Sequence, residues 1–293
     1  MTTHESQDFA QIAQLFQFEK EIDNIVYQLD SILRTGRVIG SNNISSKSIT
    51  IPSTVQIDDR VFNILSIEGT AFEGLSSTED VHIARGILSI DALAFAGCSA
   101  LTSVFIPKTV KKIHAWAFLM CPSLTSITVE EGNPVYDSRN NCDAIIETNT
   151  NKLVIGCSKT IIPKNVITIG DDAFCQCKFY KPFVVSKNIL QIGEHAFDRC
   201  QFTSVILSEN ITKIGKDIFD ECEIQSICVP NGMKEHYCKL GLEPYRDIIQ
   251  EKEKLNVLKR ITANTKNIMY WSIAIFFIVA AICLSILTYN FIS

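Results

Sequence analysis

The feature that most constrains this chain is a repeat of 22 to 23 residues. An Ala-Phe pair, replaced by Ile-Phe in the last copy, recurs along the sequence, and in five of six copies a cysteine follows the Phe by three positions. A unit this short cannot bury its own apolar face, so it must stack on its neighbours. The sequence therefore predicts a solenoid in which equivalent side chains form ladders. The ladder residues are Phe72, Phe95, Phe118, Phe174, Phe197 and Phe219, with Cys98, Cys121, Cys177, Cys200 and Cys222.

A strand-like run follows each cysteine, and its phase shows that one unit is longer than the rest. Equivalent apolar positions are spaced by 23, 33, 23, 22 and 22 residues, so one unit exceeds its neighbours by ten. The long unit spans 130–163 and contains the runs AIIE and KLVI on either side of a turn-forming Thr-Asn-Thr-Asn sequence. That pattern is typical of an additional β-hairpin. The equivalent positions are Ile106, Val129, Ile162, Val185, Leu207 and Val229.

The cysteine ladder has a structural and a metal-binding interpretation. A thiol is small and apolar enough for a tight interior corner that recurs in every coil. Metal binding needs clustered ligands, and only Cys175 and Cys177 lie that close in sequence. Residues 1–15 lack the basic region and apolar run of a secretory signal, which favours a reducing compartment. We therefore expect buried, reduced, structural thiols and no metal site.

The repeat pattern I-G-x-x-A-F-x-x-C-x-x-L-x-S-I-x-I-P-x-x-V-x-x-I is carried most fully by residues 90–113 and 113–129. These residues resemble the BspA-type leucine-rich repeats, a bacterial family of short solenoid units, and residues 131–147 look like a variant of the same family. The resemblance covers about 50–233, with weaker similarity back to about residue 16. It implies a mainly β leucine-rich-repeat solenoid with short helical or 3-10 turns and a β-rich N-terminal cap. It also implies adhesion or binding of host or matrix proteins, since some members are surface adhesins.

The N-terminal segment, residues 1–49, carries conflicting signals. Apolar residues between Phe9 and Leu33 recur with near-helical spacing. The resemblance instead assigns 18–30, 37–40, 49–55 and 60–67 to the β-rich cap, and a first coil needs a cap over its open core. We expect the β cap, with a short helix only before about residue 17 and the solenoid proper over 50–233.

The C-terminal part leaves the repeat and ends in a membrane signal. Residues 268–289 form an uncharged run with aromatic residues at both edges, close to the ~20 apolar residues that span a bilayer. We predict one C-terminal transmembrane helix there, with a polar juxtamembrane linker or helix at 234–267 and a tail at 290–293. Basic residues precede the span and none follows it, so the positive-inside rule places the solenoid in the cytoplasm. The cell surface is the alternative location. The basic residues are Lys252, Lys254, Lys259, Arg260 and Lys266.

Recognisable catalytic chemistry is missing from the sequence. It contains no G-x-S-x-G elbow, Walker A loop or G-x-G-x-x-G fingerprint, and no two histidines at H-x-x-x-H spacing. Cys142, Cys157 and Cys238 lie outside the ladder but have no evident base. A net charge of −5 opposes general nucleic-acid binding. We expect a protein partner and the lipid bilayer, and no enzyme activity, cofactor, small-molecule substrate or nucleic acid. The alternative from another class is an enzyme with a non-standard site, assembled from residues that lie far apart in the sequence.

The candidate partner site is a column of side chains that point away from the core. If Val104 and Ile106 face the interior, Phe105 between them faces out. An exposed apolar strip marks a partner site in many proteins, yet β-branched and aromatic residues favour strands anywhere, so both interpretations stay open. We call the full set of six outward positions, given below, the strand column. Four of them, Phe105, Thr128, Val184 and Ile206, are the candidate partner-binding residues. The full column is His82, Phe105, Thr128, Val184, Ile206 and Cys228.

Overall fold

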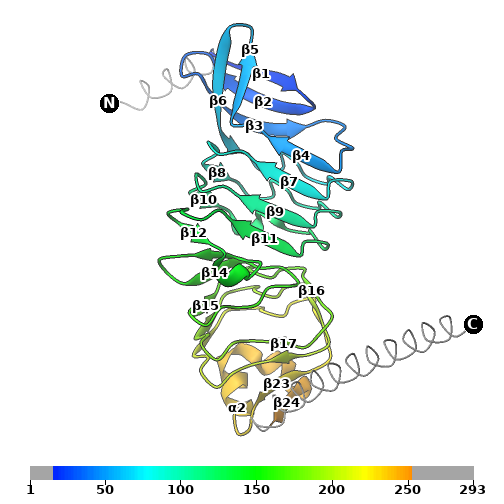
Figure 1. Ribbon diagram of the computed structural model, residues 1–293. Helices are drawn as coiled ribbons and strands as arrows, with labels where there is room; N and C mark the ends of the chain where they lie inside the picture. The colour runs from blue at the N-terminus through cyan, green and yellow to red at the C-terminus, as the bar shows by residue number, and fades with distance from the viewer. Residues whose placement is uncertain (1–15, 253–293) are drawn as a thin grey trace, which may run out of the picture.

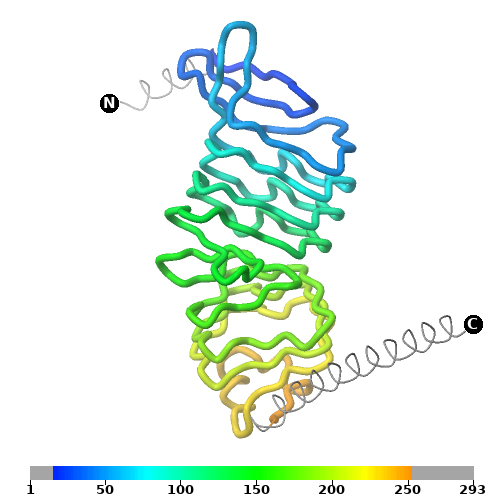
Figure 2. Tube along the Cα trace, in the orientation of Figure 1, coloured from blue at the N-terminus to red at the C-terminus, as the bar shows by residue number. Residues whose placement is uncertain are grey.

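The computed structural model describes residues 16–252, and in this part of the chain the fold is a solenoid built mainly of short β-strands. Successive coils stack along one axis, from N-terminal hairpins at one end to a short helical segment at the other (Figure 1). The long repeat lies near the middle of the stack (Figure 2). The predicted mainly β solenoid is therefore confirmed. The predicted transmembrane helix at 268–289 lies outside the described residues, as does nearly all of the segment before residue 17.

β-Strands, and no helix, form the N-terminal cap over the described residues. Three strands make an antiparallel meander, and β5 and β6 form a hairpin. Asp23 and Asn24 turn the chain between β1 and β2 with φ of 52° and 64°, the left-handed conformation of tight hairpin loops. Because this turn shifts the phase of two alternating strands, their apolar residues take on a spacing that resembles a helix. The strands are β1 (Gln17–Ile22), β2 (Ile25–Asp30), β3 (Thr35–Ser41), β5 (Thr54–Ile57) and β6 (Arg60–Ile67).

The cap feeds directly into the first parallel sheet of the solenoid. β3 pairs in parallel with β6, and β6 continues to β8 and β10. On another face of the coils, β4, β7, β9 and β11 form a second parallel sheet. The strands of these two sheets in the first half are β4 (Ser48–Ile51), β7 (Asp80–Ile83), β8 (Ser89–Ile90), β9 (Ser103–Ile106), β10 (Lys112–Ile113) and β11 (Ser126–Val129).

The second half repeats this arrangement and adds a third face. The long repeat supplies an antiparallel hairpin whose second strand, β14, starts a new parallel ladder of β15, β18 and β21. Two further sheets have the order β16-β19-β22 and β17-β20-β23-β24, in which β24 is Ile249–Lys252. The first of these strands are β12 (Tyr136–Asp137), β13 (Ile145–Glu147), β14 (Lys152–Ile155), β15 (Thr168–Ile169), β16 (Lys178–Phe179) and β17 (Phe183–Val184). The others are β18 (Gln191–Ile192), β19 (Gln201–Phe202), β20 (Val205–Ile206), β21 (Lys213–Ile214), β22 (Glu223–Ile224) and β23 (Ile227–Pro230).

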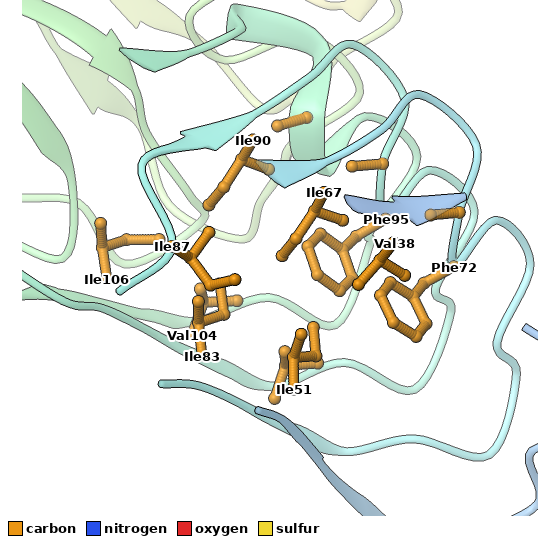
Figure 3. Close-up of a cluster of buried hydrophobic side chains, with 14 of the residues drawn as sticks. Val38, Ile51, Ile67, Phe72, Ile83, Ile87, Ile90, Phe95, Val104 and Ile106 are labelled. Carbon is orange, nitrogen blue, oxygen red and sulfur yellow. The ribbon is translucent and has the colours of Figure 1, made fainter. Parts of the chain in front are cut away.

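The phenylalanine ladder fills the centre of the coils. Phe72 and Phe95 stack with ring centroids 5.2 Å apart, and Phe118 continues the stack at 5.3 Å. Phe174, Phe197 and Phe219 form a second stack with steps of 5.4 and 5.6 Å. Around Phe72 and Phe95, isoleucine and valine side chains from successive coils complete the core (Figure 3). The Ala-Phe segments are hydrogen-bonded turns, except that Ala117 and Phe118 belong to the 3-10 helix η1 (Ala115–Phe118). A second 3-10 helix, η2 (Arg139–Asn141), lies in the long repeat.

The cysteine ladder is more than a set of small apolar fillers. The thiol of Cys200 donates to the carbonyl of Phe174 in the preceding coil at 2.9 Å, and Cys222 does the same to Phe197 at 2.7 Å. Cys98 and Cys121 repeat the contact at 3.2 Å. The ten cysteines of the described part are free thiols. Each of these four thiols therefore ties one coil to the next through a weak hydrogen bond.

The segment 234–267 was predicted to be a polar juxtamembrane linker or helix, and its described residues, 234–252, are helical up to Ile248 and then form a short strand. These residues close the end of the solenoid: Tyr237 is buried, and β24 pairs in parallel with β23 as one more coil would. The sequence does not reveal this closing role, because Arg246 and its partners Glu235 and Glu243 form an exposed ion-pair network that gives the segment a polar composition. Its elements are α2 (Lys234–Tyr237), the π-helix η3 (Cys238–Leu242), the 3-10 helix η4 (Glu243–Ile248) and β24 (Ile249–Lys252).

Candidate interaction surface

The strand register predicted for the column is confirmed. Val104 and Ile106 are buried, whereas Phe105 between them is half-buried. In the second half Val184 is 48% exposed, and Ile206 is half-buried between buried neighbours. Thus the side chains alternate between core and solvent as a strand requires.

The strand column is not one continuous strip. Thr128 is the register partner of Phe105 in the sheet of the first half, and Ile206 is the partner of Val184 in the sheet of the second half. The first sheet ends at β11 and the second begins at β17, so the structure brings the four candidates together only as two pairs. The N-terminal pair is extended by His82, whose ring stacks on Phe105 at 6.1 Å.

Cys228 does not belong to the exposed column. Its side chain is only 2% exposed, although its strand position is equivalent to that of Ile206. Gln250 of β24 lies beside it in register, because residues 249–252 add a strand that the sequence did not predict. The extra strand therefore places Cys228 inside a sheet instead of at its edge.

A glycine interrupts the phenylalanine ladder between the two halves. The Gly156 N–H donates to the Ala173 carbonyl at 2.7 Å, the same bond that the Phe174 N–H makes to Ala196 one coil later. Gly156 therefore occupies the position that Phe occupies in the six other repeat units. A Cβ on Gly156 would lie 2.1 Å from the Phe174 ring, which fills the vacated space. The Gly156 carbonyl also receives the Cys177 thiol, although at 3.9 Å.

The coil that contains Gly156 is also shorter than the others. Ile162 follows Gly156 by 6 positions, whereas Val185 follows Phe174 by 11. Ile162 is half-buried against the core, but no strand forms around it. The backbone there bonds back to the hairpin, since the Ile161 N–H donates to the Cys142 carbonyl at 3.1 Å. The long repeat thus adds a hairpin on one side and lacks about five residues of chain on the other.

A groove of about 830 Å³ lies where the shortened coil leaves space. Phe179 and Phe183 form its buried wall, and Ile161 and Tyr180 stand at its rim with 76% and 86% of their surfaces exposed. Val184 of the strand column also lines it. We call this site the mid-solenoid groove. Sequence reasoning missed it, although the short distance from Gly156 to Ile162 is a signal that could have found it.

Charge at the mid-solenoid groove is weakly positive. Lys159 and Lys181 line it together with Asp143. Both lysines are exposed, and among residues 16–252 neither has an ion-pair partner. The groove thus combines an apolar wall with two free cations and one carboxylate.

Cys142, Cys157 and Cys238, the thiols considered as nucleophiles from the sequence, are poorly suited to that chemistry. Burial raises the pKa of Cys142 to about 11, and burial also raises the pKa of Cys157 and Cys238. A thiol with a raised pKa stays protonated at neutral pH and is a weak nucleophile. Within residues 16–252 no group of three His, Cys, Asp or Glu side chains is arranged to hold a metal ion.

Comparison with protein families identifies the repeat. The model of the BspA type Leucine rich repeat region matches the chain in six copies, over residues 37–167 and 144–238. The chain belongs to this family. Membership in this family implies a protein-interaction or adhesin-like role in general terms. Leucine-rich-repeat proteins are repeat scaffolds that generally lack enzyme activity. No curated protein matches the chain.

Several solved structures match the chain at low sequence identity and with TM-scores below 0.5. The T. pallidum leucine-rich-repeat protein is 20% identical, with a TM-score of 0.42, and the match covers 76% of this chain and 96% of that one. A leucine-rich-repeat protein from Eubacterium ventriosum is 16% identical, with a TM-score of 0.42 and coverage of 72% and 71%. The pneumococcal vaccine antigen PcpA is 14% identical, with a TM-score of 0.38 and coverage of 74% and 82%.

The membrane prediction concerns residues beyond the described part. Across residues 16–252 the structure contains no helix of the length and apolar character that crossing a bilayer requires. The segment predicted to do so, 268–289, lies outside these residues.

Proposed function

We propose that this BspA-type chain is a non-enzymatic interaction module whose solenoid binds a protein partner through the strand column. The observation that carries the proposal is that apolar side chains at Phe105, Val184 and Ile206 are exposed or half-buried between fully buried neighbours on their strands. Covering such surface gains about 25 cal/mol per Å² of apolar area. These side chains contribute little to the core, so their apolar character supports a role outside it.

A pair of matched substitutions tests the column. Ile206→Glu places a charge on one member of the C-terminal pair of the strand column. Leu190→Glu places the same charge on a 41% exposed residue away from the column. The exposed Leu190→Glu should alter stability by no more than about 0.5 kcal/mol, the usual range for surface positions, and the half-buried Ile206→Glu should leave the protein folded. Partners of the tagged full-length chain are trapped by cross-linking in cells and quantified by mass spectrometry.

The expected result is that Ile206→Glu loses partners that the wild type and Leu190→Glu retain. If both variants keep the same partners, the column is not the binding surface. If Ile206→Glu unfolds the protein in a circular-dichroism melt while Leu190→Glu does not, the side chain belongs to the core and the proposed role is wrong.

We propose further that residues 268–289 anchor the chain in a membrane as a single C-terminal helix, with the solenoid on the cytoplasmic side. The uncharged run and the basic residues before it support this arrangement. Protease added to intact cells should leave the solenoid whole, and the same protease should digest it once the membranes are opened. Digestion in intact cells would place the solenoid outside and favour a cell-surface adhesin.

A further inference from the structure

The mid-solenoid groove has the size of a missing piece of chain. Between the Phe position and the interior strand position, the coil of Gly156 has 6 steps and the coil of Phe174 has 11. The difference of five residues is the stretch that in a regular coil would run beside β16 and β17. An extended segment of that length spans about 17 Å at roughly 3.3 Å per residue. The groove volume of about 830 Å³ lies within the roughly 300–1,000 Å³ of ligand sites.

Two strands present a free edge to the groove. In the described part of the chain β16 pairs only with β19, and β17 pairs only with β20. The N–H groups of Phe183 and Val185 donate to Ser204 and Ile206 in the next coil. Backbone groups alternate in direction along a strand, so those of Val184 face the groove. An edge of this kind is a template for one more strand.

The residues that line the groove indicate which side chains an added strand would need. Phe179, Phe183 and Ile161 offer apolar contacts to the side chains on one face of an extended segment. Lys159 and Lys181 stand at the groove without ion-pair partners in the described residues, against the single carboxylate of Asp143. The surplus of positive charge favours acidic residues next to the apolar ones.

We propose that the mid-solenoid groove binds an extended peptide segment of a partner protein, apolar at alternate positions and flanked by acidic residues, which adds a strand to the free edge of β17. The segment takes the place of the five residues that the shortened coil lacks. This inference rests on the proposed protein-binding function but uses a different surface, which shares only Val184 with the strand column.

The test uses a synthetic probe and the purified full-length chain. The probe is a fluorescein-labelled peptide of sequence EEVTVTVEE, and a second peptide carries Pro at the central Val. Proline removes an N–H and cannot join the interior of a strand pair. Fluorescence anisotropy should show binding of the first peptide, and binding of the proline peptide should be at least about tenfold weaker.

Groove variants then locate the binding. Ile161→Glu removes an apolar wall that is exposed and contributes little to folding. The pair Lys159→Glu and Lys181→Glu reverses the charge, and Lys111→Glu with Lys112→Glu is the matched control on exposed lysines of a regular coil. We expect Ile161→Glu and the groove pair each to weaken binding at least about tenfold, a loss typical of central interface residues. The control pair and Leu190→Glu, which lies directly before β18 of a separate sheet, should bind as the wild type does.

Each other outcome overturns the assignment. Absence of binding up to about 1 mM of the probe, equal binding of the proline peptide, or equal binding by the groove variants would each do so. Elution of the wild-type chain as a dimer that the Ile161→Glu variant does not form would assign the groove to a second copy instead. Because the groove variants leave Phe105, Thr128 and Ile206 of the strand column unchanged, failure of the groove and failure of the strand column are separate results.

Discussion

Replacing Gly156 by alanine tests the idea that this glycine stands in a phenylalanine slot. The added Cβ would lie 2.1, 2.6 and 2.7 Å from three atoms of the Phe174 ring, far inside the ~3.5–4.0 Å of normal carbon contacts. The ring cannot easily slide away, because it stacks on Phe197 at 5.4 Å and meets the edges of Phe179 and Phe183 at 5.9 and 5.2 Å.

The expected cost follows from two opposing effects. Overpacking a close-packed core costs about 1–3 kcal/mol, and three simultaneous overlaps against a held ring place this change at about 3. Alanine also restricts the unfolded chain and returns about 0.4–1 kcal/mol, since the φ of Gly156 is not left-handed. Gly156→Ala should therefore lower the free energy of unfolding by about 2 kcal/mol.

A double-mutant cycle with Phe174→Leu makes the prediction specific. Phe174→Leu alone should destabilise the protein, but it removes ring atoms that the new methyl group meets. The double variant should then be at least about 1 kcal/mol more stable than the sum of the single changes predicts. Urea unfolding of the full-length chain, followed by circular dichroism, measures all four corners. Additivity within about 0.5 kcal/mol, or a neutral Gly156→Ala, would show that Gly156 does not share a slot with that ring.

Three further changes probe the core and its end. Phe197→Ala should cost about 5 kcal/mol and Phe118→Ala about 3, because the Phe197 ring contacts four other rings and the Phe118 ring contacts one. If chemical denaturation gave the reverse order of stability losses, the ladder geometry would be contradicted. Cys200→Ser should cost about 1 kcal/mol or less in the same assay, since its hydroxyl can still donate to the Phe174 carbonyl; a loss of 3 or more, on the scale of about 1–3 for an unsatisfied group, would refute this. Tyr237→Phe should cost about 1–2 kcal/mol by removing the buried hydroxyl that donates to the Ser208 carbonyl, whereas Tyr245→Phe should cost less. Equal losses of stability in the two variants would show that this hydrogen bond does not stabilise the C-terminal end of the solenoid.

The sequence predicted the regular part of the fold well, because one rule repeats in every coil. Fixed spacing identified the Phe ladder and the interior strand positions, and the alternation of Val104, Phe105 and Ile106 gave the correct register. The cap strands were predicted from the family resemblance, against a near-helical spacing that arises from the turn at Asp23 and Asn24.

The irregular parts were harder, because they obey no repeated rule. The spacing of 33 showed that the long unit was extended, but not that its chain was also shortened between Gly156 and Ile162. The division of the strand column and the groove both follow from that shortening. The closing segment at 234–252 carries no repeat motif, and its role depends on the burial of Tyr237, which composition does not show.

The glycine in the phenylalanine ladder also bears on how the solenoid comes apart. Buried side chains group into two clusters that divide within the long repeat, with Ile145 in the first and Ile146 in the second. In a linear array each coil is stabilised only by its neighbours, so cooperativity is lost first at the weakest interface. The step from Phe118 to Phe174 has no aromatic ring in the intervening Phe position, in contrast to the unbroken stacks on either side. The protein should therefore unfold as two blocks, with an intermediate in which one stack has melted while the other keeps its amide protons protected from exchange.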